Sequence, residues 1–279
     1  MSKTLLNRLA MFETLDVCGP LTVTELAHRT GLDVTVVSRT VSACVPDGWL
    51  IRLGGKVTLG PRCTLLGHSG PFADLIAAAA PLVHAIAGVT GLVSQAYGLV
   101  GTQSVLIATA AGRGRSAPAG LAVKAPLHAT AGGRAIAVQL DPARLDALLP
   151  AEPFPDAASL LAGMAGTSAD LLFNHSAVVP AVGAGPALAA DRAELDAQLD
   201  AVRTGHFAVD HGSLDPMLHC IAVPWPQPDL PASLACIGLP DVLAANLELV
   251  HRVLAAAARS GASPHDVIAA AATASSTAK

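Results

Sequence analysis

The order of elements expected in residues 4–59 constrains the fold of this chain more than any other feature. Apolar residues recur there at helical spacing in three successive segments, and Gly31 lies in the turn between the second and the third. Two short apolar segments follow, separated by Gly54-Gly55, which predicts a hairpin with a tight turn. Three helices and a hairpin in this order predict a winged helix-turn-helix, a DNA-binding module. The expected helices cover 4–18, 23–29 and 34–45, and the expected strands cover 49–53 and 56–59.

The third helix of this module has two faces of different character. Val37 and Val41 lie at helical spacing and are expected to face the core, while hydroxyl groups and a guanidinium lie opposite. In a winged helix this polar face enters the major groove, where such groups reach base edges and phosphates. Alternatively, this polar face is the solvated face of an ordinary three-helix domain. The positively charged side chains of the hairpin would then be ordinary surface charges. The candidate DNA-binding residues are Thr24, Thr35, Ser38, Arg39 and Ser42, with Arg52 and Lys56 on the hairpin.

Charge is distributed unevenly along the chain. Residues 1–67 carry seven Lys and Arg against five Asp and Glu, a net of +2, whereas the remainder carries ten against sixteen, a net of −6. The overall charge of −4 excludes a basic nucleic-acid coat. A slightly basic N-terminal module on an acidic body is compatible with a small DNA-binding domain.

The apolar residues favour a cytoplasmic protein that does not associate with a membrane. They make up 52% of the chain, and the longest apolar run, over 75–89, is interrupted by Pro81 and His84. This run is shorter than the ~20 residues that a membrane span needs. The N-terminus lacks the apolar stretch of a signal peptide. The five cysteines are scattered and odd in number, so we expect reduced, mostly buried thiols.

The rest of the chain predicts an α+β domain around an antiparallel sheet. Residues 61–71 have the composition of a hinge, and an apolar helix kinked at Pro81 is expected to follow. Residues 151–190 are rich in Ala, Gly and Pro and support no assignment. The expected helices cover 72–88, 131–140, 142–149, 191–203 (ended by Gly205) and 242–259; the expected strands cover 92–97, 104–110, 207–210, 218–224 and 233–237, with a turn at 98–101 and a loop at 111–120.

A tight strand-to-helix turn is expected in Pro126–Ala137, which reads PLHATAGGRAIA. The Thr130 hydroxyl can accept a hydrogen bond from the first helical turn, and Gly132 and Gly133 leave room for a ligand to approach the backbone. Such a helix N-terminus can hold an anion, for example a carboxylate. A turn that serves packing alone would have the same sequence, and the local residues do not separate the two interpretations.

Together with VRTGHFAVD (202–210) and CIAVP (220–224), this stretch resembles the IclR family of bacterial transcriptional regulators, over about residues 4–262. The resemblance implies a winged helix-turn-helix over 1–67, a linker helix over 68–90 and a GAF-like effector-binding domain over 91–264. The remaining residues, 265–279, are expected to form a disordered tail. It also implies a homodimer or a dimer of dimers. Such a protein binds double-stranded operator DNA in a way that a small-molecule effector alters.

The resemblance further implies where the effector binds. The family places it against the loop that matches Ala131-Gly132, facing an acid and a cysteine. The family's two serines on the following strand are replaced here by Ala235 and Ile237, so we expect an organic or aromatic acid with an apolar part. The candidate effector-binding residues are Thr130, Ala131, Gly132, Asp210, Leu218, Cys220, Ala235 and Ile237, while His128 is expected to serve as a structural hydrogen-bonding group.

The alternative function is a metabolite-binding or hydrolytic domain with a vestigial DNA-binding module. It would use Cys220 as a nucleophile, but His219 is adjacent to it and is expected on the opposite face of a strand. A metal site formed by Cys220, His206, His211 and His219 would match no known spacing. We therefore expect a regulator that is not an enzyme and that has no cofactor and no metal.

Overall fold

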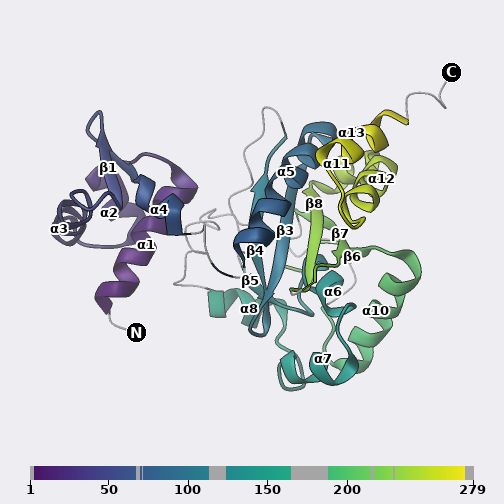
Figure 1. Ribbon diagram of the computed structural model, residues 1–279. Coiled ribbons are helices and arrows are strands. Elements are labelled where there is room, and N and C mark those ends of the chain that lie inside the picture. Colours follow the sequence, from purple (N-terminus) through teal and green to yellow (C-terminus); the bar gives the residue numbers. More distant parts are fainter. Residues whose placement is uncertain are drawn as a thin grey trace. The chain divides into compact units, whose positions relative to one another are not determined.

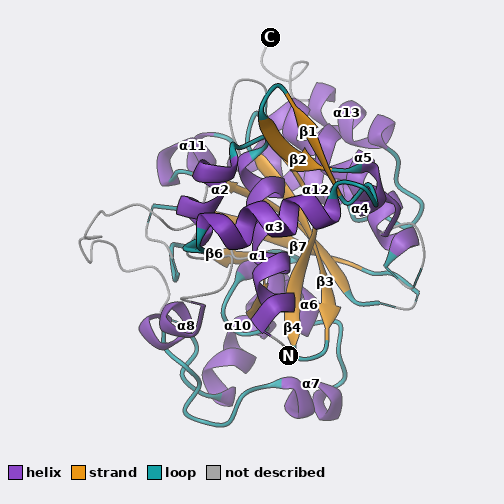
Figure 2. Ribbon diagram, turned by 90° about the vertical axis from the view of Figure 1, so that its left-hand side faces the viewer, coloured by secondary structure: helices purple, strands orange, loops and turns teal. Residues whose placement is uncertain are grey.

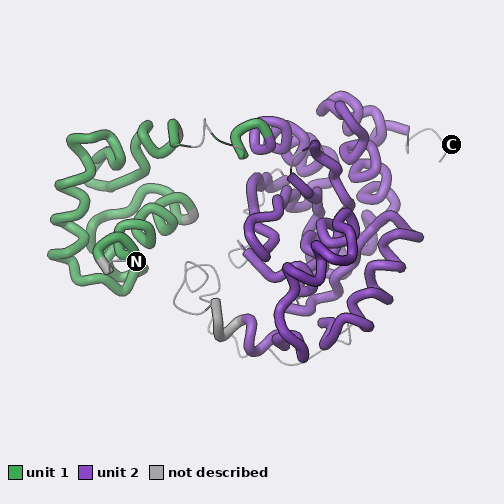
Figure 3. Tube along the Cα trace, turned by 60° about the horizontal axis from the view of Figure 1, so that its bottom comes forward, with its two compact units in different colours: residues 1–74, 119–121, 164–176 green, residues 75–118, 122–163, 177–279 purple. Residues whose placement is uncertain are grey.

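The chain forms two compact units, which are described separately (Figures 1 and 3). The first contains the residues up to Asp74, and the second begins at Leu75. The structure is a computed structural model that describes residues 3–66, 70, 72–112, 124–164, 188–214, 217–228 and 230–273.

The first unit is a winged helix-turn-helix, as the sequence predicts. The hairpin pairs Leu50 with Leu59, and Val57 forms an additional antiparallel bridge with Leu21. The elements are α1 (Lys3–Cys18), α2 (Val23–Thr30), α3 (Val34–Cys44), β1 (Leu50–Leu53) and β2 (Lys56–Leu59). Their apolar faces meet in one core, formed by Met11, Leu15, Leu21, Leu26, Ala27, Val37, Val41, Cys44, Leu50 and Val57.

Helix caps fix the turn between α2 and α3. Thr22 and Glu25 form a capping box at the start of α2, which satisfies two N–H groups of the first turn. Gly31 ends α2 in the left-handed conformation, with φ 64°. The Asp33 carboxylate then accepts hydrogen bonds from two N–H groups of the first turn of α3. The turn geometry is thus specified by residues local to it.

The segment expected as a hinge contains a short helix, α4 (Pro61–Leu66). Pro61 favours this start because its missing N–H is one that the first helical turn leaves unpaired. The hinge composition of this segment did not predict the helix.

Helix α5 (Ala73–Thr90) runs on through Pro81. Within the described part of the chain, it alone has the length and apolar composition of a membrane-spanning helix. Leu75, Leu82, Val83 and Ile86 are nevertheless buried, which is the burial pattern of a helix in a protein core.

An antiparallel sheet of six strands forms the centre of the second unit (Figure 2). Its order is β5-β4-β3-β8-β7-β6, so the two central strands come from distant parts of the sequence. The strands are β3 (Val93–Val100), β4 (Gln103–Ala110), β5 (Lys124–Pro126), β6 (Ala208–Asp210), β7 (His219–Trp225) and β8 (Ala232–Gly238). The turn expected from Gly98 onward lies later, at Gly101 with φ 58°, because β3 continues through Gly98.

Helices cover the sheet on both faces. On one face α6 (Ala131–Ala137) lies against the strands, and α10 (Arg192–Gly205) packs on α6. The other group consists of α11 (Pro240–Ala245), α12 (Leu247–Ala257) and α13 (Pro264–Ala272), which lie together with α5 in Figure 1. Two short helices, α7 (Pro142–Leu148) and α8 (Ala157–Met164), follow α6 along the chain. The rest of the segment without an assignment, 165–187, and most of the expected loop, 113–123, lie outside the described residues.

The C-terminal region departs from the prediction in two places. The single helix expected over 242–259 is interrupted at Asn246, whose amide donates to the carbonyl of Val242 and so competes with the helical backbone pattern. The disordered tail expected from residue 265 is wrong for 265–272, which form α13 behind a capping box of Ser263 and Asp266. Helix α10 also ends differently, because His206 takes the left-handed conformation expected of Gly205.

Candidate functional site

The exposed face of α3 carries the side chains expected to meet DNA. Arg39 and Ser42 are exposed, and Ser38 is half-buried. Thr35 is exposed as well, but its hydroxyl hydrogen-bonds to the carboxylate of Asp33 and lowers the pKa of that group. Arg39 therefore supplies the cation of this face, and the hydroxyl groups of Ser38 and Ser42 flank it.

The two hairpin cations, Arg52 and Lys56, are exposed, as is Thr24 on α2. The pKa of the Glu25 carboxyl is lowered, mainly by hydrogen bonds with Thr22 and to a smaller degree by the positive charge of Lys56. Val57, which follows Lys56, forms a bridge with Leu21 just ahead of α2, so the hairpin lies beside the start of this helix. Glu25 offsets part of the positive charge that the hairpin would present to a phosphate.

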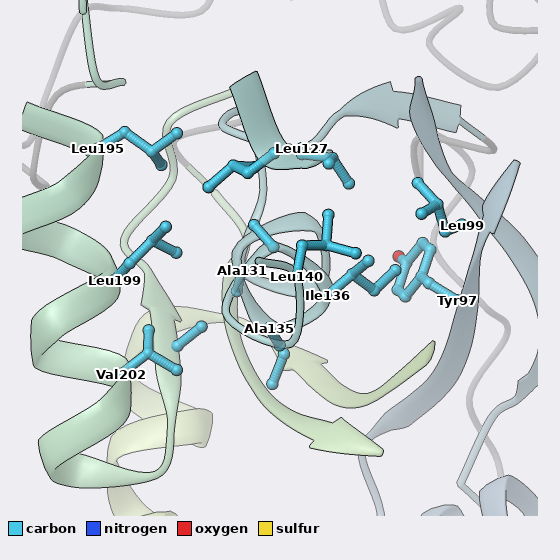
Figure 4. Close-up of a cluster of buried hydrophobic side chains, with 14 of the residues drawn as sticks. Tyr97, Leu99, Leu127, Ala131, Ala135, Ile136, Leu140, Leu195, Leu199 and Val202 are labelled. Carbon is cyan, nitrogen blue, oxygen red and sulfur yellow. The ribbon is translucent and has the colours of Figure 1, made fainter. Parts of the chain in front are cut away.

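The turn before α6 is shaped by packing. Thr130 Oγ1 accepts a hydrogen bond from the Gly133 N–H at 3.0 Å, which makes Thr130 the expected N-cap. A Cβ on Gly132 would lie 2.9 Å from a ring carbon of Tyr97, and one on Gly133 would lie 2.5 Å from the Leu127 carbonyl oxygen. Close packing therefore suffices to explain both glycines. Ala131 lies in the buried apolar cluster that α6 shares with α10 (Figure 4).

The register of the sheet brings four of the expected effector residues onto one face. Asp210 pairs with Cys220, and Cys220 pairs with Ile237. Paired residues share a face, and so do residues two apart on a strand, which adds Ala235. Cys220 packs against the cluster around α6, so this is the face that α6 covers. Leu218 is half-buried, just ahead of β7.

Asp210 lies next to a buried arginine. Its side chain is 7% exposed, and its Oδ1 accepts a hydrogen bond from the Ser213 N–H at 2.9 Å. The Arg134 guanidinium is 4% exposed and donates to the carbonyls of His128 (3.0 Å) and Val209 (2.7 Å). Burial lowers the pKa of Arg134, and the nearby Asp210 carboxylate opposes that shift. The two opposite charges partly compensate each other in the interior.

Tyr97 extends this polar group across the sheet. Its hydroxyl donates to Gln95 Oε1, and Ser233 Oγ on the neighbouring strand donates to the Gly132 carbonyl at 3.0 Å. Burial raises the pKa of the Tyr97 hydroxyl well above its usual value, and Cys220 and Asp210 act in the same direction. Tyr97 pairs with Ser233, and its side chain lies on the same face of the sheet as Ala235.

The chemistry of Cys220 does not favour a nucleophile. Burial, followed by the charge of Asp210, raises the pKa of its thiol well above the usual value. His219 precedes it on the strand, and His219 Nδ1 lies 3.4 Å from His211 Nδ1. His206 is exposed at the end of α10. Within the described ranges, no three or more His, Cys, Asp or Glu residues are arranged to hold a metal ion.

Solved structures that match this architecture include IclR regulators. The chain matches the IclR transcriptional regulator of Alicyclobacillus acidocaldarius with a TM-score of 0.57 and 19% identity, over 97% of this chain and 99% of that one. The chain has the IclR fold. An IclR homologue of Microbacterium hydrocarbonoxydans, solved with 4-hydroxybenzoate, matches with a TM-score of 0.60 and 18% identity, over 97% and 100% of the two chains. The Thermotoga maritima IclR matches with a TM-score of 0.57 and 19% identity, over 92% and 95%.

No protein-family model matches the sequence, and neither does any curated protein. The IclR fold therefore rests on the structure. It agrees with the winged helix-turn-helix and the GAF-like α+β domain that the sequence resemblance implies.

Within the IclR fold, the sequence reasoning missed five residues beside the two candidate sites. Gln95 and Tyr97 alternate on one strand, and Tyr97 is the single tyrosine of the chain, so a polar pair in an apolar strand was the available signal. Arg134 is a charged residue inside an otherwise apolar helix. On α3, Val34 and Val36 are 47% and 40% exposed. The sequence prediction named only polar residues on the outer face of this helix and so missed these two valines.

Proposed function

We propose that this protein is a transcriptional regulator that binds double-stranded operator DNA through the first unit and a small-molecule effector through the second. The observation that carries the proposal is the exposed face of α3 around Arg39, in a chain that follows the IclR fold over 97% of its length. Hydroxyl groups and one guanidinium on such a helix can contact base edges and phosphates. As implied by the resemblance, we place the protein in the cytoplasm as a homodimer or a dimer of dimers.

We further propose that the effector is an organic or aromatic acid with an apolar part, and that it binds on the α6 face of the sheet. Asp210 and Arg134 supply a polar end, while the buried Ala235 and Ile237 supply an apolar surface. The IclR homologue of M. hydrocarbonoxydans was solved with 4-hydroxybenzoate, which is an acid of this class.

Retardation of the DNA upstream of the protein's own gene tests the DNA-binding half of the proposal. We expect binding that weakens steeply with salt, and Arg39→Ala should weaken it roughly tenfold or more while reducing the salt slope by about one if Arg39 contacts a phosphate. Arg144→Ala is the matched control, because Arg144 is exposed on α7 in the second unit. Equal retardation by wild type and Arg39→Ala at low salt would count against α3 as the DNA-binding helix.

A thermal-shift panel of organic and aromatic acids tests the effector half. Acids that raise the melting temperature of the wild type should shift that of Asp210→Ala by a different amount, because this variant removes a negative charge from the proposed binding face. Asp241→Ala is the control, since Asp241 is exposed on α11. Equal shifts in all three proteins would show that the site has been assigned to the wrong face.

The enzymatic alternative has less support. A cysteine nucleophile acts as the thiolate, and burial of Cys220 favours the protonated thiol. Turnover by the purified protein that is abolished in Cys220→Ala would nevertheless favour it.

A further inference from the structure

The carboxamide of Gln95 is a buried polar group that is only half used. Gln95 is 0% exposed in the middle of β3, and its Oε1 accepts a hydrogen bond from the Tyr97 hydroxyl. Its Nε2 has no partner within the described part of the chain. Folded proteins rarely retain such a buried donor group without a bound water or ligand to accept from it.

Tyr97 determines which way this carboxamide is turned. The buried tyrosine proton needs an acceptor, and Gln95 Oε1 supplies it. If the carboxamide were rotated by 180°, both the tyrosine proton and Oε1 would lack a hydrogen-bond partner. That orientation is less favourable than the observed one, in which only Nε2 lacks a partner. Tyr97 is itself held in place, because its ring packs on Gly132 where a Cβ would lie only 2.9 Å away. The unpaired group is therefore the amino end of the side chain.

The two direct neighbours of Gln95 leave this amino group unpaired. Ala235 on β8 has a methyl group that accepts no hydrogen bond, and the exposed Thr109 on β4 forms none with Nε2. The adjacent register row on the same face contains Cys220 and Ile237, followed by Asp210 at the edge strand. Asp210 accepts from Ser213 and interacts with Arg134. The unpaired donor therefore belongs to the face on which we place the effector.

We infer that Gln95 determines specificity for the acid group of the effector, with Nε2 donating to a carboxylate oxygen. The inference rests on the proposed effector site. A carboxylate is a strong acceptor for such a donor. The carbonyl oxygen of an uncharged amide accepts a hydrogen bond but carries no negative charge. An amide ligand therefore separates the contribution of the hydrogen bond from that of the charge.

The test compares full-length wild type with Gln95→Met in thermal-shift assays, followed by calorimetric titration. The probes are benzoate, phenylacetate, 4-hydroxybenzoate and short aliphatic carboxylates, with benzamide and benzyl alcohol as uncharged analogues. We expect carboxylates to bind the wild type and benzyl alcohol to fail, and Gln95→Met should weaken the best carboxylate roughly tenfold or more. Benzamide should bind more weakly than benzoate but lose affinity in the same variant. Gln103→Met, at the far end of the β3–β4 pair, is the matched control and should leave the affinity unchanged.

A double variant, Gln95→Met/Tyr97→Phe, guards against misfolding, because it removes both partners and leaves neither unpaired. It should melt close to the wild type and still lose carboxylate binding. Equal affinity in the wild type and this variant would overturn the inference, as would equal binding of benzyl alcohol and benzoate, or a wild type that binds none of the carboxylates. Retardation of operator DNA by the same preparations tests the proposed DNA-binding function separately from the role of Gln95. If the protein retards DNA but carboxylate binding does not depend on Gln95, the DNA-binding function is supported and only the role of Gln95 is contradicted.

Discussion

Gly132 and Gly133 pack against different kinds of atom. Substitution by alanine should therefore lower the unfolding free energy by a different amount at each position. At Gly132 the added Cβ meets a side-chain ring, that of Tyr97, whereas at Gly133 it meets the backbone carbonyl of Leu127. A ring can shift by a few tenths of an ångström more easily than a strand end can. Overpacking of this kind costs about 1–3 kcal/mol or more in unfolding free energy.

We therefore predict that Gly133→Ala destabilises the protein more than Gly132→Ala does. Chemical denaturation of both variants measures the difference, with Gly205→Ala in α10 as control because its Cβ would meet nothing within 4 Å. The reverse order, or no loss in either variant, would contradict the packing role of the turn.

His128 gives the protein a predictable dependence on pH. The ring is fully buried, its centroid lies 4.9 Å from that of Phe154, and Nε2 lies 3.5 Å from the Pro155 carbonyl oxygen. Burial lowers its pKa, and the charge of Arg134 acts in the same direction. A lowered pKa in the folded state means that the unfolded chain binds the proton first, so stability is present above pH ~6.5 and is lost as the pH falls.

We predict that the unfolding free energy of His128→Gln falls less steeply below pH ~6.5 than that of the wild type, by at most about 1.4 kcal/mol per pH unit. Urea denaturation between pH 5 and 8 measures the two slopes. Burial also lowers the pKa of His219 and His251, so some slope should remain. His84→Gln on the exposed side of α5 is the control, and an unchanged slope in His128→Gln would show that His128 binds the proton equally in the folded and unfolded states.

At the scale of the element, α2 and the hairpin share a charge interaction that should influence DNA binding. Glu25 closes the capping box of α2 and also lies near Lys56. Glutamine can serve as the third residue of a capping box, so Glu25→Gln preserves the helix start and removes only the negative charge.

We predict that Glu25→Gln binds operator DNA a few-fold more tightly than the wild type at low salt, and that the difference shrinks as salt screens the charge. Retardation assays over a range of ionic strength measure this effect, with Glu248→Gln in the second unit as the matched control. Identical affinities at every salt concentration would place the hairpin away from the DNA.

The elements that the sequence predicted correctly are those whose burial leaves a regular pattern. Helix α3 shows Val37 and Val41 at helical spacing, and Asp33 is a strong N-cap signal, so its start and its buried face were predictable. Helix α13 is PHDVIAAAA, in which a run of alanines carries little information about which face is buried. The interruption at Asn246 was equally hidden, because it depends on a side chain that competes with the backbone.

At the scale of the whole molecule, the candidate effector site depends on strand pairing across distant segments. The resemblance supplied Asp210 and Cys220, but only the register shows that they share a row with Ile237. Gln95 lies more than a hundred residues before its neighbour Ala235, and no local pattern reports that contact. Periodicity reveals which residues are buried, whereas the partners of a buried polar group depend on the complete fold.

If the two units act as one regulator, DNA and effector must influence each other equally. Linkage requires that a ligand which changes the affinity for DNA by some factor has its own affinity changed by DNA by the same factor. We predict this equality for the tightest-binding carboxylate, measured as the Kd for operator DNA with and without saturating carboxylate, and as the Kd for carboxylate with and without saturating DNA. The typical coupling is about 5–150-fold. An equal concentration of sodium chloride is the control, because the added salt weakens DNA binding by itself. A carboxylate that binds the second unit and leaves the DNA affinity unchanged would be a ligand of this protein and not its effector.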